Sequence, residues 1–315
     1  MNDLQFYNST FVDTAEALFS KEESIPEAMS MLSAQLQHLR TSLPVHAWKE
    51  YIVQEFRRHT LLTTLHNDPL SRRAYIKPRG YAGDAVMLDY IYSMDEGALP
   101  QDLRECTSSA QRMCASIVQA DAGQAVCARK RLLAQKIDEV AEHVSHPHVL
   151  SLACGHLREA ASSRAARTRR LGRFVAVDQD QESLKIVEQE FRPLGVETLR
   201  ASVRDILMDR VVLNGFDFVY AAGLYDYLAL PVAQRLTAQL FRMLNPGGRI
   251  LLANFMPGIT MAGYMEACMD WWLIYRDRAE LLQCAQTLPE KQLAHLSLFA
   301  DDYQNIVYLE ITRKK

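Results

Sequence analysis

The chain has 315 residues, of which 49% are hydrophobic and 23% charged, and its formal net charge is −3. This length and composition predict a folded, soluble protein with a substantial core. No block of about five or six like charges appears, which argues against nucleic acid or an anionic membrane as a partner. The oligomeric state is left open.

The sequence also lacks the features of a membrane or secreted protein. Its longest apolar runs, such as residues 249–256, are far shorter than a membrane span, and the first residues lack the basic and apolar regions of a signal peptide. We therefore expect a cytoplasmic location. The six cysteines form no CxxC pair and no zinc-like spacing with histidine, so we expect reduced thiols and no metal site.

The first part of the chain has a helical pattern. Apolar residues recur at three-and-four spacing over about residues 6–145, and no strand-like alternation appears there. We therefore predict an N-terminal all-helical lid or substrate region over residues 1–145, followed by a second domain over residues 146–315. Two basic stretches, one near Arg129 and one at residues 164–170, are best explained as solvated helix faces and a loop.

From residue 148 onward, strand-like runs alternate with helical patterns. The seven runs are HVLSLA, RFVAVD, VETLRAS, FDFVYAA, RILLANFM, LSLFADD and NIVYLEITR. This alternation predicts an α/β fold, a Rossmann-like sheet of seven mostly parallel strands with helices on both faces. The last two runs are too close for a helix between them, so we expect a hairpin that inserts one antiparallel strand near the sheet edge.

A nucleoside site is suggested by the first two strand runs. The first run ends in a turn that contains Gly155, and the second ends in Asp178. A glycine turn lets ligand atoms approach the backbone, and a carboxylate at the tip of the next strand can accept both ribose hydroxyls. Only one glycine occupies a turn where dinucleotide sites usually show three, so a plain strand–helix junction is the alternative.

Other polar residues follow later strands and are expected at the same edge of the sheet. Tyr225, Asp226 and Tyr227 lie in the loop after the fourth run, and Asn254 lies near the end of the fifth. Asp205 follows the third run, where it either accepts a hydrogen bond from an adenine amino group or caps a helix.

In this order, these features resemble the class I S-adenosylmethionine-dependent methyltransferase fold, over about residues 149–315. The resemblance implies S-adenosylmethionine as the cofactor. It also implies that Ala153, Cys154 and Gly155 contact its methionine part, that Asp178 binds the ribose and that Asp205 binds the adenine. Further cofactor contacts are implied for Glu159, Gln179, Ile206, Gly223, Leu224 and Asn254. His156 and Leu157 are bulkier than is usual in that family, which suggests an atypical pose of the methionine end.

Two segments have a narrower resemblance. PRGYAGDAVMLDYIY and GYMEACMDWWLIYRDRAEL are similar to a bacterial methyltransferase subfamily that includes fatty-acid methyl ester signal synthases, with relatives that cyclise S-adenosylmethionine to azetidine-2-carboxylate. The glycine-rich GYAGD turn predicts a lid that brings Tyr81 and Asp84 to the ligand, with an ordinary interhelical turn as the alternative. Arg276 and Glu266 in the second segment are weaker candidates for the site.

The expected activity is methyl transfer to a small molecule, with a role in secondary metabolism. In-line positioning is the main requirement of such an SN2 step, and Tyr81, Tyr225 or Tyr227 would hold the sulfonium by cation–π contact. A carboxylate acceptor needs no base, whereas for an amine or hydroxyl the proton acceptors would be Asp84, Glu159, Asp226 or Tyr225.

The alternative activity is a cyclase with S-adenosylmethionine as its sole substrate. Its amino group would attack its own γ-carbon and release methylthioadenosine. A non-catalytic nucleoside-binding regulator is disfavoured because so many polar and aromatic residues gather at the expected site. The acceptor is left open.

Overall fold

The computed structural model describes residues 14–315, which form two compact units. The first unit holds the chain up to Gln124 together with Gly258–Trp272, and the second holds Ala125–Pro257 together with Leu273–Lys315. The sequence predicts a single boundary at residue 145. The units instead divide within the long helix α10 (Asp121–His143). The first unit also contains a late segment of the chain, Gly258–Trp272.

Every regular element of the first unit, within the described residues, is helical, as the apolar spacing predicts. Some of its helices begin at polar caps: Asp68 accepts hydrogen bonds from the backbone N–H groups of Leu70 and Ser71, and Thr107 accepts one from Ala110. Besides the start of α10, the elements are η1 (Glu22–Ser24), α2 (Ile25–Ser42), α3 (Val45–Ala47), the π-helical η2 (Trp48–Val53), α4 (Gln54–Arg58), α5 (Thr60–Leu65), α6 (Pro69–Ile76), α7 (Ala85–Asp95), α8 (Gln101–Arg104), α9 (Ser108–Gln119) and α16 (Ala262–Cys268).

Helix α16, the late segment of this unit, packs closely against α2. The backbone N–H of Gly263 donates to Oε1 of Gln37 at 3.0 Å. A Cβ added at Gly263 would lie 2.5 Å from the carbonyl carbon of Leu36 and 2.6 Å from the nitrogen of Gln37. Glycine is therefore required here because the two helix backbones approach too closely for any side chain.

We expect Gly263→Ala to lower the free energy of unfolding by about 1–3 kcal/mol, the usual cost of forcing an extra group into a packed core. Chemical denaturation measures this loss. Gly223→Ala is the control, because the nearest atom to an added Cβ there is 4.0 Å away. An equal, small effect of both substitutions would contradict the close approach of α16 to α2.

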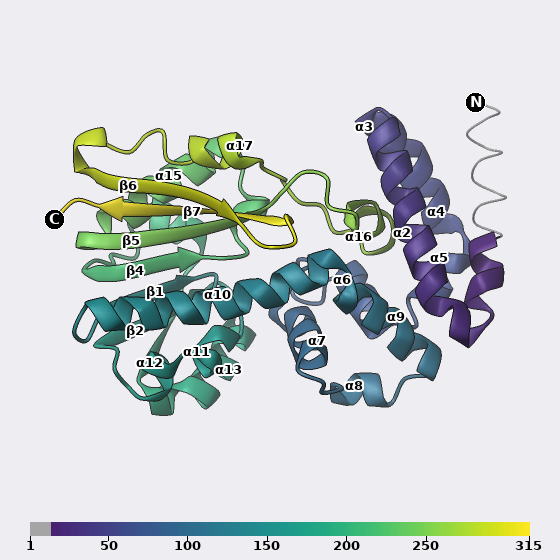
Figure 1. Ribbon diagram of the computed structural model, residues 1–315, viewed down its shortest axis with the longest axis horizontal. Helices are drawn as coiled ribbons and strands as arrows, with labels where there is room; N and C mark the ends of the chain where they lie inside the picture. The colour runs from purple at the N-terminus through teal and green to yellow at the C-terminus, as the bar shows by residue number, and fades with distance from the viewer. Residues whose placement is uncertain (1–13) are drawn as a thin grey trace. The chain divides into compact units, whose positions relative to one another are not determined.

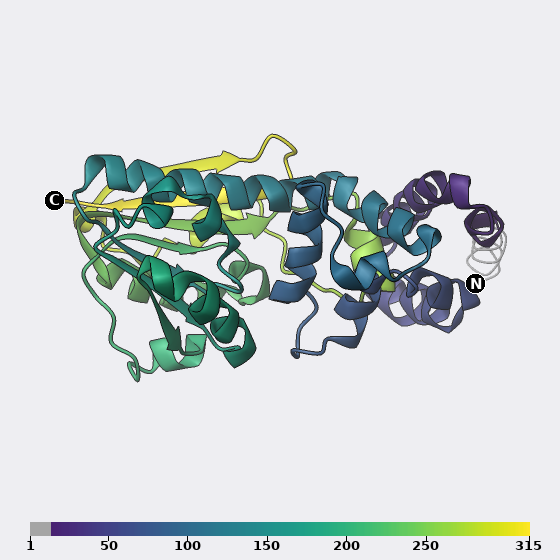
Figure 2. The ribbon, with the colours of Figure 1, turned by 90° about the horizontal axis from the view of Figure 1, so that it is seen from below.

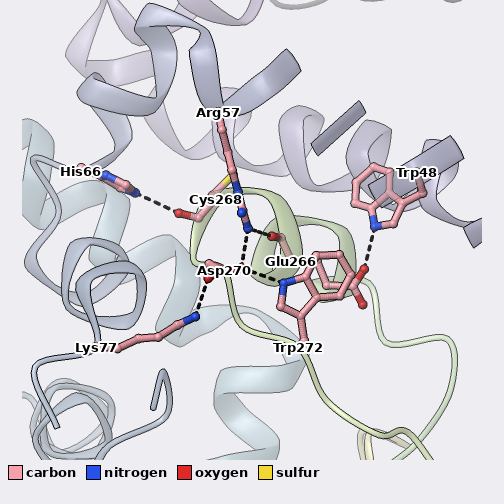
Figure 3. Close-up of polar contacts among 8 residues, drawn as sticks. All are labelled: Trp48, Arg57, His66, Lys77, Glu266, Cys268, Asp270 and Trp272. Carbon is pink, nitrogen blue, oxygen red and sulfur yellow. Dashed lines mark hydrogen bonds and ion pairs between the residues drawn. The ribbon is translucent and has the colours of Figure 1, made fainter. Parts of the chain in front are cut away.

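The carboxylate of Glu266 joins α16 to two other helices of the first unit. Its Oε2 accepts a hydrogen bond of 2.7 Å from the indole Nε1 of Trp48 (Figure 3), and its Oε1 pairs with the guanidinium of Arg40 at 2.8 Å. Both oxygens of this buried carboxylate are thus engaged, which explains how a charged side chain is tolerated inside the unit. Glu266 therefore has a structural role.

The carboxylate of Asp270, just after α16, accepts hydrogen bonds from a second set of side chains (Figure 3). Its Oδ1 accepts from Arg57 at 2.6 Å and from the indole Nε1 of Trp272 at 2.8 Å, and its Oδ2 pairs with Lys77. These donors hold the pKa of the carboxyl below its ordinary value, although partial burial opposes them. Asp270 thereby fixes the end of the late segment to α4 and α6.

The second unit is built on a seven-stranded sheet in the order β3-β2-β1-β4-β5-β7-β6 (Figure 1). The pairs from β3 to β5 are parallel, and β7 pairs antiparallel with both β5 and β6. The predicted fold class and terminal hairpin are confirmed. The strands are β1 (His148–Leu152), β2 (Arg173–Asp178), β3 (Val196–Arg200), β4 (Phe216–Ala221), β5 (Leu244–Phe255), β6 (Leu293–Ala300) and β7 (Ile306–Arg313).

Helices cover both faces of this sheet, because the chain runs from β1 outward to β3 and then returns to β4 on the other side of β1. In one layer, Asp138 of α10 accepts hydrogen bonds from Ser163 and from the N–H of Ala165 in α12. Figure 2 shows α10 running alongside the strands, where its Lys136 pairs with Glu310 of β7 at 2.6 Å. This layer contains α10, α11 (Arg158–Ser162), α12 (Arg164–Arg167), α13 (Gln181–Phe191) and η3 (Arg192–Leu194).

In the other layer, Gln239 of α15 donates to the carbonyl of Ile206 in α14, and Gln234 donates to the carbonyl of Gln283 in α17. This layer contains α14 (Val203–Leu207), α15 (Leu230–Arg242) and α17 (Arg278–Gln283), while η4 (Tyr225–Tyr227) follows β4 and η5 (Glu290–Gln292) precedes β6. No helix within residues 14–315 is long and apolar enough to cross a membrane.

Candidate functional site

The turn after β1 and the tip of β2 are joined by one carboxylate. Oδ2 of Asp178 accepts a hydrogen bond of 2.9 Å from the backbone N–H of Gly155, and its Oδ1 accepts one of 2.9 Å from Asp180. A carboxylate has about four lone-pair positions, so these two bonds leave acceptor capacity for a diol. Burial raises the pKa of Asp178, and the N–H groups of Asp180 and Gly155 oppose that rise.

The backbone of this turn is unusual. Ala153, Gly155 and Leu157 all have φ angles of 53–54°, in the left-handed region that favours glycine. Each non-glycine residue in this region adds a cost of order 1–3 kcal/mol, which persists only where the surroundings enforce it. Here they do, since the N–H of Cys154 donates to the carbonyl of Val177 on β2. The single glycine of the sequence motif therefore sits in a turn that is held from two sides.

A buried ionisable cluster lies beside this turn, and the sequence indicated only one of its members. The hydroxyl of Tyr220, on β4, donates to Oε1 of the predicted residue Glu159 at 2.6 Å. Burial raises the pKa of Glu159, whereas Tyr220 and the charges of Arg129 and Lys130 lower it. Arg129 and Lys130 are each only 5% exposed, so the interpretation of this basic stretch as a solvated helix face is wrong for these two side chains.

Arg129 comes from α10 and reaches the end of β4. Its Nη1 donates to the carbonyl of Ala222 at 2.7 Å, and its Nη2 lies 4.0 Å from where a Cβ on Gly223 would be. The predicted residues Gly223 and Leu224 are exposed and half-buried, respectively. A cation and an accessible backbone thus meet at this strand end.

A second network closes the loop after β4 onto β5. Nη1 of Arg276 donates to the carbonyl of Tyr225 and to Oδ1 of Asn254, both at 2.7 Å, and its Nη2 donates to Leu228. The Nδ2 of Asn254 donates in turn to the carbonyl of Ile274 at 2.8 Å. Asn254 was predicted as a ligand contact, but it is fully buried, and these bonds give it a role in positioning the loop.

Asp226 is the carboxylate of this network, and its pKa is shifted from the ordinary value. Its Oδ1 accepts from the backbone N–H of Phe255 at 2.7 Å. Burial raises its pKa to about 6, against the N–H of Phe255 and the charges of Arg129 and Arg276. A carboxylate with a pKa in this range, at the carboxyl ends of β4 and β5, is suited to accept a proton near neutral pH.

The two tyrosines around Asp226 have different surroundings. Tyr225 is fully buried in the sheet core, where its hydroxyl and that of Thr237 are 2.8 Å apart, so its ring packs between β4 and α15 instead of facing a ligand. Tyr227 is 39% exposed. Of the two predicted cation–π partners on this loop, only Tyr227 has an accessible ring.

The contacts of Asp205 decide between its two interpretations, which are adenine binding and helix capping. Its Oδ2 accepts from the backbone N–H of Ser202 while its own N–H donates to the Ser202 hydroxyl, which forms a capping box at the start of α14. The hydroxyl of Ser202 also donates to Oδ2, and Oδ1 pairs with Arg210. These contacts lower its pKa to about 2. The helix-capping interpretation therefore accounts for Asp205. Ile206 is buried in the core, so only its backbone is left for a ligand, and Gln179 is exposed beyond the tip of β2.

Tyr81 and Asp84 belong to the first unit. Asp84 is fully buried, accepts from the N–H of Met87 at 2.9 Å and starts α7. Its carboxylate also binds Nε of Arg73 at 2.8 Å. These contacts give Asp84 a structural role and lend no support to the predicted proton transfer. Gly80 has a φ of 88°, which fits a bend in this segment, and the predicted lid function stays a prediction.

Comparisons with known proteins agree with this arrangement of the second unit. Residues 149–248 match a family model described as a methyltransferase domain. This region of the chain is similar to methyltransferase domains. Together with the fold, the match supports S-adenosylmethionine as the methyl donor. No curated protein matches the chain.

Solved structures resemble the chain at low sequence identity. A protein described as a possible exported protein from Bordetella parapertussis has a TM-score of 0.60 and 14% identity, with 94% of this chain and 97% of that chain covered. The N-methyltransferase NodS from Bradyrhizobium japonicum, in complex with S-adenosylhomocysteine, has a TM-score of 0.43 and 11% identity over 59% and 88%. Magnesium protoporphyrin IX methyltransferase from Synechocystis, with bound S-adenosylmethionine, has a TM-score of 0.42 and 10% identity over 61% and 84%.

Proposed function

We propose that this protein is an S-adenosylmethionine-dependent methyltransferase that acts on a small molecule. The observation that carries the proposal is the bond between Asp178 and the N–H of Gly155, because it fixes a backbone turn and an acidic strand tip side by side within the region that matches a methyltransferase domain. Such a pair binds a nucleoside, with the turn near the ligand and the carboxylate on the ribose.

The residues around this turn are suited to bind the methionine part and the sulfonium of S-adenosylmethionine. Arg129 supplies positive charge at the end of β4, where it would bind the α-carboxylate of the methionine part, and Lys130 adds charge near Glu159. Glu159 lies within the influence of both cations and would face the α-amino group. Tyr227 is the accessible ring for the sulfonium on the loop after β4.

S-adenosylmethionine supplies a methyl group on a sulfonium, which departs as a neutral thioether. The protein therefore has to align the acceptor and, where the acceptor carries a proton, remove it. We assign proton removal to Asp226. An amine or hydroxyl acceptor would use this base, whereas the fatty-acid carboxylate suggested by the subfamily resemblance would not.

A cyclase is the second candidate, and the burial of Glu159 favours it. A buried carboxylate with a raised pKa can take a proton from the α-amino group and leave that nitrogen nucleophilic. The amine would then attack the γ-carbon, the bond from that carbon to sulfur would break, and methylthioadenosine would leave. Both candidates use the same ribose and methionine contacts.

Product analysis decides between the two. Purified protein would be incubated with S-adenosylmethionine alone, and with panels of carboxylate, amine and hydroxyl acceptors. Adenosylhomocysteine that forms only with an acceptor supports the methyltransferase and names its acceptor class. Methylthioadenosine that forms without an acceptor, together with a cyclic amino acid, would replace this proposal with the cyclase, and failure to bind S-adenosylmethionine would overturn both.

Arg129→Met provides a direct test of the methionine contact. We expect its affinity for S-adenosylmethionine to fall about tenfold, because a charge-assisted hydrogen bond to a carboxylate is lost. Methylthioadenosine has no carboxylate and should bind the variant and the native protein alike. Calorimetric titration of both ligands measures the difference. Equal losses for the two ligands would mean that Arg129 only supports the loop after β4.

A role in secondary metabolism and a cytoplasmic location are further parts of this proposal, and so is a lid formed by the GYAGD turn, residues 80–84. For the lid, hydrogen exchange at Arg79 and Tyr81 should slow when the donor is added.

A further inference from the structure

The second unit contains a cavity at the end of the sheet opposite the candidate site. It has a volume of about 330 Å³, within the range of small-molecule sites. Phe174 at the start of β2 and Val196 at the start of β3 line it, together with Ala166 and Leu194. Phe174 and Asp178 are four residues apart on β2, at about 3.3 Å each, so this wall of the cavity lies roughly 13 Å from Asp178 at the other end of the strand.

The lining of this cavity is about half apolar and half polar, and its rim is basic. Its apolar wall is offered by the half-buried side chains of Leu171 and Leu194, whereas Phe174 and Val196 are almost completely buried. Arg169 and Arg192 also line the cavity and are exposed to solvent. Arg169 donates to the carbonyl of Pro193, which places its guanidinium beside η3. Two arginines next to an apolar wall form a surface that matches an anion attached to an apolar group.

The surrounding charge favours an anion further. Residues 164–173 contain arginines at five positions and no acidic residue, in a chain whose net charge is −3. Three carboxylates offset part of this charge: Glu142 pairs with Arg164, Glu197 with Arg173, and Glu188 with Arg192. Among residues 14–315, no carboxylate pairs with Arg169. A guanidinium at the rim is therefore available for a ligand.

We propose that this cavity is a second ligand site, which takes a small aromatic or aliphatic molecule with a carboxylate or phosphate group. The apolar part lies against Leu171 and Leu194, and the anionic group binds Arg169 and Arg192. This site is separate from the methyl-donor site and does not depend on the proposed function.

Calorimetric titration of the full chain tests the site. The probes are phenyl phosphate and 3-phenylpropionate, which separate a phosphate from a carboxylate, with inorganic phosphate and 3-phenylpropanol as partial ligands. We expect at least one aromatic anion to bind, and each partial ligand to bind at least tenfold more weakly, because each makes only half of the contacts. No binding of either aromatic anion would overturn the proposal.

Variants locate the binding. Arg169→Met and Arg192→Met should each weaken the aromatic anion about tenfold, whereas Arg167→Met, an exposed arginine of the same run outside the cavity, should not. Arg169→Met also removes a bond to the carbonyl of Pro193 and could lower stability. Arg192→Met tests the site independently, because the partner of Arg192 among residues 14–315 is the exposed Glu188. Equal losses at Arg167 and Arg192 would indicate diffuse charge attraction and refute a built site.

Discussion

Asp226→Asn is expected to abolish most methyl transfer to an amine or hydroxyl acceptor, with a fall in kcat of about 10²–10⁴-fold, the usual contribution of a general base. The amide keeps the acceptor for the N–H of Phe255 but cannot take a proton. In the native protein, kcat should rise with pH through about 6, where the raised pKa of Asp226 places its ionisation. Steady-state kinetics over pH measures both effects. A variant with full kcat, or a native profile that is flat around pH 6, would remove Asp226 from the reaction.

The same substitution should stabilise the protein at neutral pH. A carboxyl whose pKa is raised by folding favours the folded state only while it is protonated. That contribution is complete below the ordinary value of 3.8 and is lost as the pH rises through about 6. The difference of about two pKa units corresponds to roughly 3 kcal/mol as an upper limit. We therefore expect Asp226→Asn to unfold at a higher denaturant concentration at pH 7 and to show no gain at pH 3.

Asp302→Asn is the matched control for this experiment. Asp302 is exposed on the loop between β6 and β7, and its substitution should change the free energy of unfolding by less than about 0.5 kcal/mol. A stabilisation that is equal in the two variants would reflect net charge alone. A stabilisation at Asp226 only, coupled to lost activity, would identify a carboxylate that is kept in an unfavourable place for catalysis.

Asp178→Ala is expected to weaken the binding of S-adenosylmethionine by about 1.5–3 kcal/mol, because two hydrogen bonds from the ribose to a charged group are lost. The substitution also removes the acceptor for the N–H of Gly155, so the turn after β1 loosens as well. Calorimetry gives the affinity, and thermal unfolding confirms that the variant is folded.

Asp180→Ala distinguishes the loss of the ribose hydrogen bonds from a loosening of this edge of the fold. Asp180 caps α13 by accepting from the N–H of Glu182, so its loss should cost about 1 kcal/mol of stability without removing a ribose acceptor. Its affinity for the donor should stay near the native value. If the two alanine variants lose affinity equally, Asp178 acts only through the fold of this edge.

The sheet was predictable from the sequence because each strand carries its own signal. Buried parallel strands appear as apolar runs, and the short connection before β7 leaves no room for a helix, which forces the hairpin. The contact between Asp178 and Gly155 followed from the same logic, since the ends of neighbouring parallel strands meet.

Side-chain surroundings were harder to predict. Tyr225 follows β4, as a rim residue would, but the turn of η4 directs its ring to Thr237 in the core. Arg129 and Lys130 lie in a charged stretch that is typical of a solvated helix face, and only the docking of α10 on the sheet buries them. No local pattern encodes such burial, because it depends on which distant element covers the helix.

The path of the chain has a consequence for synthesis and for dissection of the protein. Helix α2 is translated early, yet α16, which packs closely against it, is translated only after the last of the parallel strands. A nascent chain therefore leaves the part of α2 under α16 uncovered until residue 272 has left the ribosome, so the helical unit cannot mature co-translationally ahead of the sheet. For the same reason a fragment cut at residue 124 or 145 would lack an internal part of its own core, and the helical unit should be isolated only with the late segment joined back to it.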